Sequence, residues 1–306
     1  MGMESTCVVE KGDERYPAML LDLSSPPERL YCKGSPEALS RPSISIVGAR
    51  RATPYGVAAA KMAGRIAAEC GLVVVSGGAM GCDSAAARAA LDAGGSTVVV
   101  SGCGADRVYP RSSRDVFERA AEGAGVVVSL EPWGSPPRRY AFPKRNRVIA
   151  ALSEATFVVE AGLRSGTMGT ASVAVELGRR LYAVPGSIFS PESAGTNRLI
   201  ADGAAIVCCE ADLESCISLD FDRLRLLEQS MPSESSRMMS ALVAQPLRAD
   251  DLANRFEESV LTVLRALGDY EARGWVVRLR DGRYAPSEEF LLARDRMEAG
   301  KSDAGT

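Results

Sequence analysis

Short apolar runs alternate with alanine-rich stretches of helical length between residues 43 and 208, and this alternation constrains the fold most strongly. Each run is β-branched and continuous, which is typical of strands that are buried on both faces. The runs are Ile44–Val47, Leu72–Val75, Thr97–Val100, Val126–Val128, Thr156–Val159, Leu181–Val184 and Ala205–Val207. Helices are expected between them, at Tyr55–Cys70, Ser84–Ala93, Ser113–Glu122, Val148–Leu152 and Thr170–Arg179. This order predicts an α/β fold with a doubly wound, mostly parallel sheet, which binds ligands at the carboxyl ends of its strands.

The flanking segments differ in composition from this region. Three prolines in Tyr16–Gly34 indicate an extended segment that packs on the core, and an acidic, then serine-rich stretch after Cys208 indicates a linker. Three short helices (near Ser236–Val243, Ala249–Phe256 and Ser259–Arg273) and two short strands (Trp275–Arg278 and Arg283–Ala285) then predict a small winged-helix domain. The expected boundaries are 1–42 for the extended segment, 43–210 for the sheet domain, 211–235 for the linker, 236–290 for the winged helix and 291–306 for a tail.

Composition excludes several kinds of chemistry. The 306 residues include no histidine, so Ser-His-Asp and Cys-His catalysis are ruled out, and the eight cysteines form no CxxC pair that would indicate a metal site. No cofactor motif is present: the dinucleotide fingerprint GxGxxG and the nucleotide-binding P-loop are both missing. The chain has no apolar run long enough to span a membrane and no signal-like start, which predicts a cytoplasmic protein without a membrane partner.

Four glycine-bearing loops follow predicted strands. They are Gly48–Arg51, Ser76–Gly81, Ser101–Gly104 and Leu163–Thr167. Glycine lets backbone N–H groups approach an anion closely, and a helix N-terminus adds further donors. A single such loop is more often a simple chain reversal, but several at one end of a sheet favour a phosphate site. The candidate phosphate-binding residues are Gly48, Arg50, Gly77, Gly78, Gly102, Ser165, Gly166 and Thr167.

A basic segment precedes the helix predicted at Val148. Because the net charge is only −3, a nucleic-acid site has to be a local patch, and Trp133–Arg147 is one: it has five cations and no acid. Its cations can pair with phosphates and an aromatic ring can stack on an unpaired base. The alternative is a solvated charged helix start with Phe142 as a core anchor. The cations are Arg138, Arg139, Lys144, Arg145 and Arg147.

An ordered series of blocks resembles the DprA/Smf family over roughly residues 15–207. The blocks are Ser45–Arg50, Val75–Asp83, Val108–Pro110, Phe142–Ile149, Val159–Thr167, Ala183–Ser187 and Gly195–Ile200. The resemblance implies a Rossmann-like domain that binds single-stranded DNA, forms a homodimer, and protects DNA and helps load the RecA recombinase during natural transformation.

Residue by residue, the resemblance places Arg50, Lys144, Arg145 and the Ser165-Gly166-Thr167 turn at phosphates, and Phe142 at a base or as support. Matched positions with less defined roles are Asn146, Arg147 and Asn197; Arg147 could instead be a buried partner of Asp83 or Glu160.

The chain departs from the family pattern at two positions of the second loop. Met80 stands where the family usually has arginine, and Ala87 where it has histidine, which removes a cation from the pocket region and puts the affinity in question.

The sequence is also compatible with two other functions. One is a phosphoribohydrolase of the LOG type, which uses a GGxGTxxE turn on a similar fold. Here the positions after Gly166-Thr167 supply no acid before Glu176, so no catalytic residue is expected and the chain is not expected to be an enzyme. The other is a sensor that binds a mononucleotide without turnover.

The predicted winged helix does not have the charge of a duplex reader. Between Pro246 and Glu289 there are seven arginines and nine acids. Winged helices that bind duplex DNA use a basic recognition helix. The composition therefore favours contact with a protein or self-association.

Overall fold

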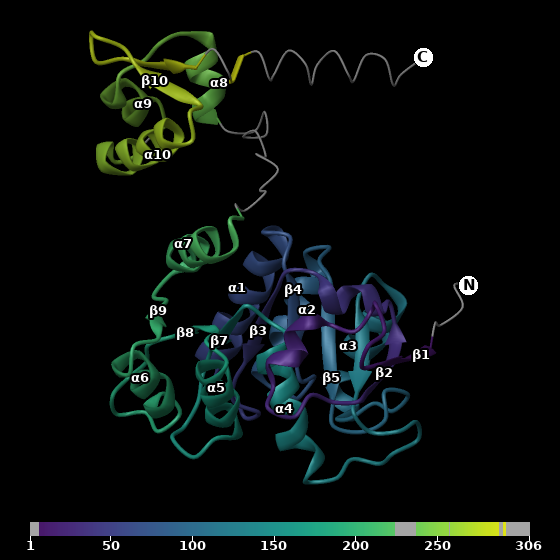
Figure 1. Cartoon of the computed structure of the whole chain (residues 1–306). Helices are drawn as coiled ribbons and strands as arrows, with labels where there is room; N and C mark the ends of the chain where they lie inside the picture. Colours follow the sequence, from purple (N-terminus) through teal and green to yellow (C-terminus); the bar gives the residue numbers. More distant parts are fainter. Residues whose placement is uncertain (1–5, 224–236, 257, 288–289, 292–306) are drawn as a thin grey trace, which may run out of the picture. The chain divides into compact units, whose positions relative to one another are not determined.

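The computed structural model describes residues 6–223, 237–256, 258–287 and 290–291, and it divides the chain into two compact units, Met1–Leu226 and Leu227–Thr306 (Figure 1). Among the described helices, none is long and apolar enough to cross a lipid bilayer.

A nine-stranded sheet with the order β1-β2-β6-β5-β4-β3-β7-β8-β9 forms the centre of the first unit. From β6 to β9 the neighbouring strands are parallel, which confirms the expected mostly parallel α/β sheet. The chain runs outward from β3 to β6 and then returns to β7 on the other side of β3, so the order reverses between β3 and β7. The strands are β3 (Ser43–Val47), β4 (Val73–Ser76), β5 (Thr97–Ser101), β6 (Val126–Ser129), β7 (Ala155–Val158), β8 (Arg180–Ala183) and β9 (Ala205–Ile206).

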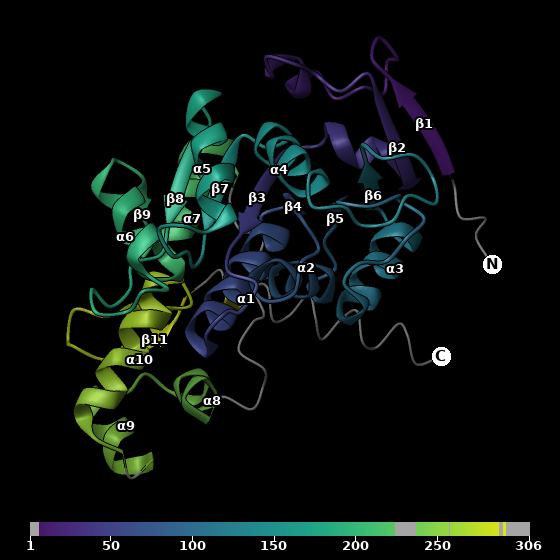
Figure 2. The ribbon, with the colours of Figure 1, turned by 90° about the horizontal axis from the view of Figure 1, so that it is seen from below.

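Helices cover both faces of this sheet. Figure 2 shows α1, α2 and α3 on one face and α4 and α5 on the other. α6 follows β8 and packs against that strand, and α7 packs against α1. The helices are α1 (Pro54–Glu69), α2 (Cys82–Asp92), α3 (Arg114–Glu122, after the short 3-10 turn η3, Arg111–Ser113), α4 (Ala141–Ala151), α5 (Gly166–Glu176), α6 (Ala194–Ala201) and α7 (Glu210–Phe221).

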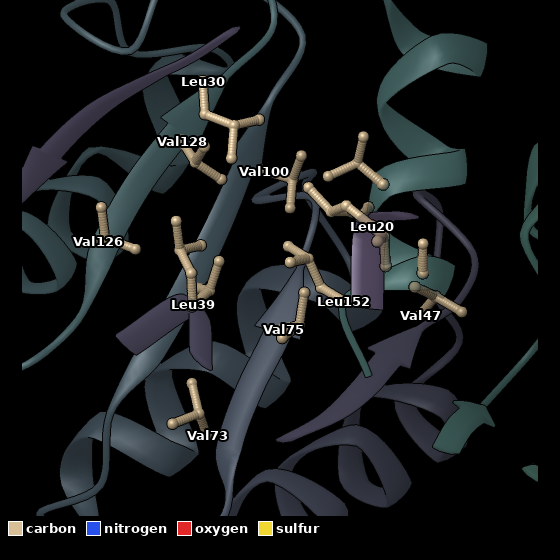
Figure 3. Packing of buried hydrophobic residues seen from close by; sticks show 14 of the residues in the cluster. Leu20, Leu30, Leu39, Val47, Val73, Val75, Val100, Val126, Val128 and Leu152 are labelled. Carbon is tan, nitrogen blue, oxygen red and sulfur yellow. The ribbon is translucent and has the colours of Figure 1, made fainter. Parts of the chain in front are cut away.

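The central strands are buried along their whole length, as their continuous apolar sequences predict. Every residue of β3, β4, β5, β6 and β7 is buried. Alternate residues of one strand enter different cores. Val73 and Val75 pack toward α4 and the N-terminal segment (Figure 3). Val74 packs toward α1 and α2. Burial on both faces explains why these strands show no polar alternation.

Within the expected N-terminal segment 1–42, which is described from residue 6 onward, two stretches are strands of the sheet, whereas we expected an extended segment packed on the core. β1 (Thr6–Glu10) pairs antiparallel with β2 (Arg29–Gly34), and β2 pairs antiparallel with β6. Two short 3-10 turns belong to this segment. η1 (Ala18–Asp22) lies between β1 and β2, and η2 (Pro36–Ser40) lies between β2 and β3. The pairing with β2 covers the edge of β6, which would otherwise leave backbone groups unpaired. Burial alternates along β2.

Two helices begin earlier than expected. α4 starts at Ala141 rather than Val148, so the basic segment lies within the helix. Pro143 reads as a helix breaker in the sequence, but it occupies the first turn, where the missing N–H has no intrahelical acceptor. α5 starts at Gly166 rather than Thr170 because the Ser165 side chain accepts the N–H of Thr167 and caps the helix.

The expected linker 211–235 begins with a helix. α7 places Leu213 and Ile217, both fully buried, in the core formed by α1 and β8. The hydroxyl of Tyr182 on β8 also donates to Asp220. Of the acidic residues that indicated a linker, Glu210 and Asp212 lie in the first turn of this helix, and Asp220 faces Arg180 and Tyr182 of β8. The rest of the expected linker, residues 224–235, lies outside the described residues.

Within residues 237–256 and 258–287, the second unit has three helices followed by a two-stranded antiparallel sheet. The helices are α8 (Arg237–Ala244), α9 (Ala249–Phe256) and α10 (Val260–Ala272), and the strands are β10 (Val276–Arg278) and β11 (Tyr284–Pro286). Their core includes Leu242, Leu252, Leu267 and Trp275. Except for Leu291, the expected tail 291–306 lies outside the described residues.

Candidate functional site

A pocket of about 410 Å³ opens at the carboxyl ends of β3 and β7, where the strand order reverses. Crevices at such switch points are the usual ligand sites of open α/β sheets. The loops after β3 and β7 with the start of α5 supply most of the wall, and the loop after β4, the start of α2 and α4 supply the rest. The lining residues are Val47, Gly48, Ala49, Arg50, Ala79, Asp83, Arg145, Asn146, Ser165, Gly166, Thr167 and Thr170.

The N-terminus of α5 forms one wall of this pocket. Ser165 caps the helix, and the Thr167 hydroxyl donates to the carbonyl of Gly48 (3.1 Å), which ties the β7 loop to the β3 loop. Gly166 lies in the first turn, and the Asn146 side chain donates to its carbonyl (3.4 Å). The first N–H groups of a helix and its dipole favour an anion at this position. The predicted Ser165-Gly166-Thr167 turn and Asn146 thus lie together.

Asp83, on the first turn of α2, organises the base of the pocket. Its carboxylate accepts the backbone N–H groups of Gly48 (3.4 Å) and Gly77 (3.1 Å), so it joins two of the glycine loops. Burial raises the pKa of Asp83, against the opposing charge of Arg145 and these N–H bonds. The N–H groups of Gly48 and Gly77 were expected to bind phosphate, but they are used inside the protein.

Arg145 is a buried cation beside Asp83. Only 4% of it is exposed, although it lines the pocket. Burial lowers its pKa to about 10, with the charge of Asp83 acting against this and that of Arg50 adding to it, so the guanidinium stays positive at neutral pH. Its Nε has no hydrogen-bond partner among the described residues. A buried charge with unused donor capacity favours an anion in the pocket.

The aromatic ring of Phe142 is enclosed by cations and another ring. The guanidinium of Arg50 lies 5.0 Å from the Phe142 ring centroid, and that of Arg145 lies 6.0 Å away. The ring of Tyr109 is tilted against it at 5.8 Å. Lys144 is exposed on α4, with its ammonium 5.7 Å from the ring of Tyr140. Arg50 and Lys144 are therefore exposed to solvent, whereas Arg145 is buried.

Two expected glycines serve packing instead of the pocket wall. Gly78 has a φ of +63° and leaves room for the rings and methyls of Phe117 and Val99. Gly102 lies under Phe142, since a Cβ there would come within 2.7 Å of its ring. Neither lines the pocket at the switch point.

Two further expected residues are engaged elsewhere. The Asn197 side-chain amide exchanges two hydrogen bonds with the backbone of Gly186, both 3.0 Å long. Arg147 is exposed and donates to Ser24 (3.0 Å), so it is not the buried partner of Asp83 or Glu160 that its spacing allowed. That role falls to Arg145 because α4 begins early and turns position 145 inward.

Glu160 is the other buried carboxylate near the β3 loop. It accepts the backbone N–H of Thr53 (3.2 Å) and its hydroxyl, at the start of α1. It thus holds the end of the Arg50 loop and is 2% exposed. No group of three or more histidine, cysteine, aspartate or glutamate side chains that could hold a metal ion occurs within the described ranges.

Sequence reasoning missed Asp83 as an organiser and Tyr109 as a neighbour of Phe142. A signal for Asp83 was available, because an acid that opens a helix after a glycine loop can accept the amides of that loop. Nothing in the spacing placed Tyr109 against Phe142, since their contact joins the loop after β5 to α4.

A protein-family model described as DNA recombination-mediator protein A matches residues 7–218. The chain belongs to this family. Protein Smf of Escherichia coli (strain K12) is 31% identical over 284 residues, which cover 90% of this chain and 76% of that protein.

Two solved structures of the family are similar to this chain. The DNA processing protein A (DprA) of Streptococcus pneumoniae has a TM-score of 0.65 and 34% identity, over 69% of this chain and 74% of that one. The DNA processing protein A of Helicobacter pylori, described for its single-stranded DNA binding mode, has a TM-score of 0.64 and 30% identity, over 71% of this chain and 98% of that one. The α/β sheet of the first unit is thus the DprA fold.

Proposed function

We propose that this chain binds the backbone of single-stranded DNA at the switch-point pocket and does not turn it over. The observation that carries the proposal is the buried, partly unsatisfied Arg145 in a pocket that also receives the N-terminus of α5. Exposed Arg50 and Lys144 extend the positive charge to solvent. The family membership and the DNA-binding relative support a strand as the ligand.

The test measures the affinity of the full chain for a labelled oligo-dT over a range of salt concentrations. About three or four phosphate contacts predict a log–log slope near −2 to −3 for a single strand. The double variant Arg50→Glu with Lys144→Glu abolishes binding in this proposal. Both side chains are exposed, so their reversal leaves the core intact, whereas an acid at the buried position 145 would face Asp83.

Arg50→Glu alone has a matched control in Lys61→Glu, which makes the same single charge reversal at an exposed position of α1 that does not line the pocket. This control keeps the affinity of the unmodified chain. The proposal is wrong if the unmodified chain binds no oligo-dT, or if Lys61→Glu weakens binding as much as a reversal at Arg50.

A mononucleotide ligand is the second candidate, because a volume of about 410 Å³ lies in the range of small-molecule pockets. In the same assay, competition by a mononucleotide at its own site would favour this candidate. Turnover of such a ligand is not proposed: Asp83, the acid that lines the pocket in the described structure, already accepts two backbone N–H groups. Release of free base from a nucleotide, measured by chromatography, would favour the LOG-like hydrolase instead.

Family membership extends the proposal to the biology of the strand. We infer that the chain protects single-stranded DNA and helps load RecA during natural transformation, as a cytoplasmic homodimer. What supports this is the match to the DNA recombination-mediator family and the similarity to DNA processing proteins.

The second unit fits a winged helix, since three helices precede an antiparallel pair of strands. On α10, the helix that would enter a duplex groove, Leu261 and Leu264 are exposed. Two acids, Asp269 and Glu271, follow on the same helix. Exposed apolar and acidic side chains suit a protein contact better than a phosphate backbone.

A further inference from the structure

The exposed ring of Tyr109 lines a hollow beside the phosphate pocket. We propose that Tyr109, with Met80 beside it, forms a stacking site for a nucleobase of the bound strand. This inference rests on the proposed binding of single-stranded DNA and names which part of the strand the neighbouring surface takes. Tyr109 is 44% exposed and Met80 is 49% exposed.

The place is a shallow hollow next to the larger pocket. Its volume is about 30 Å³, which is smaller than a base, so a base lies on this surface rather than inside it. Arg50, Ala79 and Arg145 line both hollows, which therefore share a wall. The hollow is lined by Arg50, Gly77, Ala79, Met80, Tyr109, Pro110, Phe142 and Arg145.

Phe142 supports this surface from behind. Its ring rests on Gly102, where no side chain would fit, and Arg50 covers it at 5.0 Å. Tyr109 leans on it at 5.8 Å with an interplanar angle of 51°. With its surroundings filled in this way, Phe142 has little ring surface for a base, and the solvent-facing ring is that of Tyr109. The proposal therefore assigns Phe142 the supporting role and Tyr109 the base contact.

The chemistry of the hollow suits a base attached to a phosphate. Every base has an apolar π-face, and stacking on an aromatic ring does not depend on the base sequence. The Met80 thioether is a flexible, polarizable neighbour for such a face. Arg50 lines both the pocket and the hollow, so a phosphate held by Arg50 in the pocket brings its own nucleoside near the hollow. Arginine at position 80 would add a phosphate contact, whereas methionine adds apolar surface.

The test compares two ligands and two variants of the full chain. The ligands are oligo-dT and an oligonucleotide of the same length whose sugars carry no bases. Tyr109→Ala lowers the affinity for oligo-dT by about 5- to 100-fold, the range expected for one stacked base. It leaves the affinity for the abasic strand and the salt slope unchanged, because phosphate contacts are kept. Tyr109→Phe keeps the ring and stays close to the unmodified chain on both ligands.

Two results would overturn the inference while leaving the proposed function standing. One is an equal loss on both ligands in Tyr109→Ala, which would show that Tyr109 only supports the loop. The other is no change on either ligand. If the unmodified chain binds neither strand, the proposed function itself fails, and the stacking site fails with it.

Discussion

Glycine at position 77 is required by a side chain, not by the backbone angle or by a ligand. A Cβ built on Gly77 would lie 1.5 Å from a terminal nitrogen of Arg145, so the guanidinium occupies the space that glycine leaves. Gly48 is similar, with the Cys82 side chain at 2.6 Å from its would-be Cβ. These glycines let the buried Arg145 guanidinium and the Cys82 side chain approach the loops closely, and they prepare the anion site indirectly.

Replacing Gly77 with alanine tests whether the position of the Arg145 guanidinium matters for binding. The methyl group displaces the guanidinium of Arg145, and because a hydrogen bond to a charged group contributes about 1.5–3 kcal/mol, oligo-dT affinity falls roughly tenfold or more. Gly169→Ala is the control, since nothing lies within 4 Å of a Cβ on that residue of α5. The control keeps its affinity and gains up to about 1 kcal/mol in unfolding free energy from helix propensity. Unchanged binding in Gly77→Ala would show that the position of Arg145 does not matter.

The strands were predictable because burial on both faces leaves an unbroken run of apolar residues, as in Thr97–Ser101. The starts of the helices were harder to predict. Proline in the first turn of α4 and the serine cap of α5 both resemble loop residues in a sequence, although each is compatible with a helix start. Because α4 begins at Ala141, Arg145 lies within the helix and is buried, whereas a helix that began at Val148 would have left it in the preceding segment. The pairing of β2 with β6 depends on contacts between distant segments, which no local pattern reports.

Substitutions on α7 test whether this helix belongs to the core of the first unit. Ile217→Ala removes a fully buried side chain from the core and lowers the free energy of unfolding by about 2–5 kcal/mol. Leu219→Ala on the same helix is the control, because that side chain is 84% exposed and its loss changes stability by no more than about 0.5 kcal/mol. Urea unfolding followed by circular dichroism measures both. Equal, small effects would mean that residues 210–221 behave as a linker in solution.

The whole molecule consists of a large unit that carries the pocket and a small unit with its own core. The doubly wound sheet and the presence of a second, helical module were both predictable from the order of apolar segments. The boundary was not, because the acidic start of α7 has the composition of a linker. The pocket position followed from topology, but the buried charge pair at its base depended on three-dimensional packing.

Ending the chain after Leu226 tests the independence of the large unit. The shortened protein folds, since its sheet and both cores are complete within residues 6–223. It keeps oligo-dT affinity within about threefold and the same salt slope, because the proposed phosphate contacts remain. A binding assay beside thermal unfolding measures this. A collapse of affinity in a folded fragment would place essential contacts in the second unit.

The position of β3 between β4 and β7 has a consequence for the order in which the protein forms during synthesis. The backbone N–H of Ser43 at the start of β3 donates to the side chain of Glu154, 111 residues later in the chain. The loop of Arg50 likewise meets the turn at Thr167 only after β7 has paired. A nascent chain on the ribosome therefore has no pocket until residues 155–167 emerge, and pairing over such a distance is slow. DNA binding consequently appears late and all at once, on chains whose central sheet has closed.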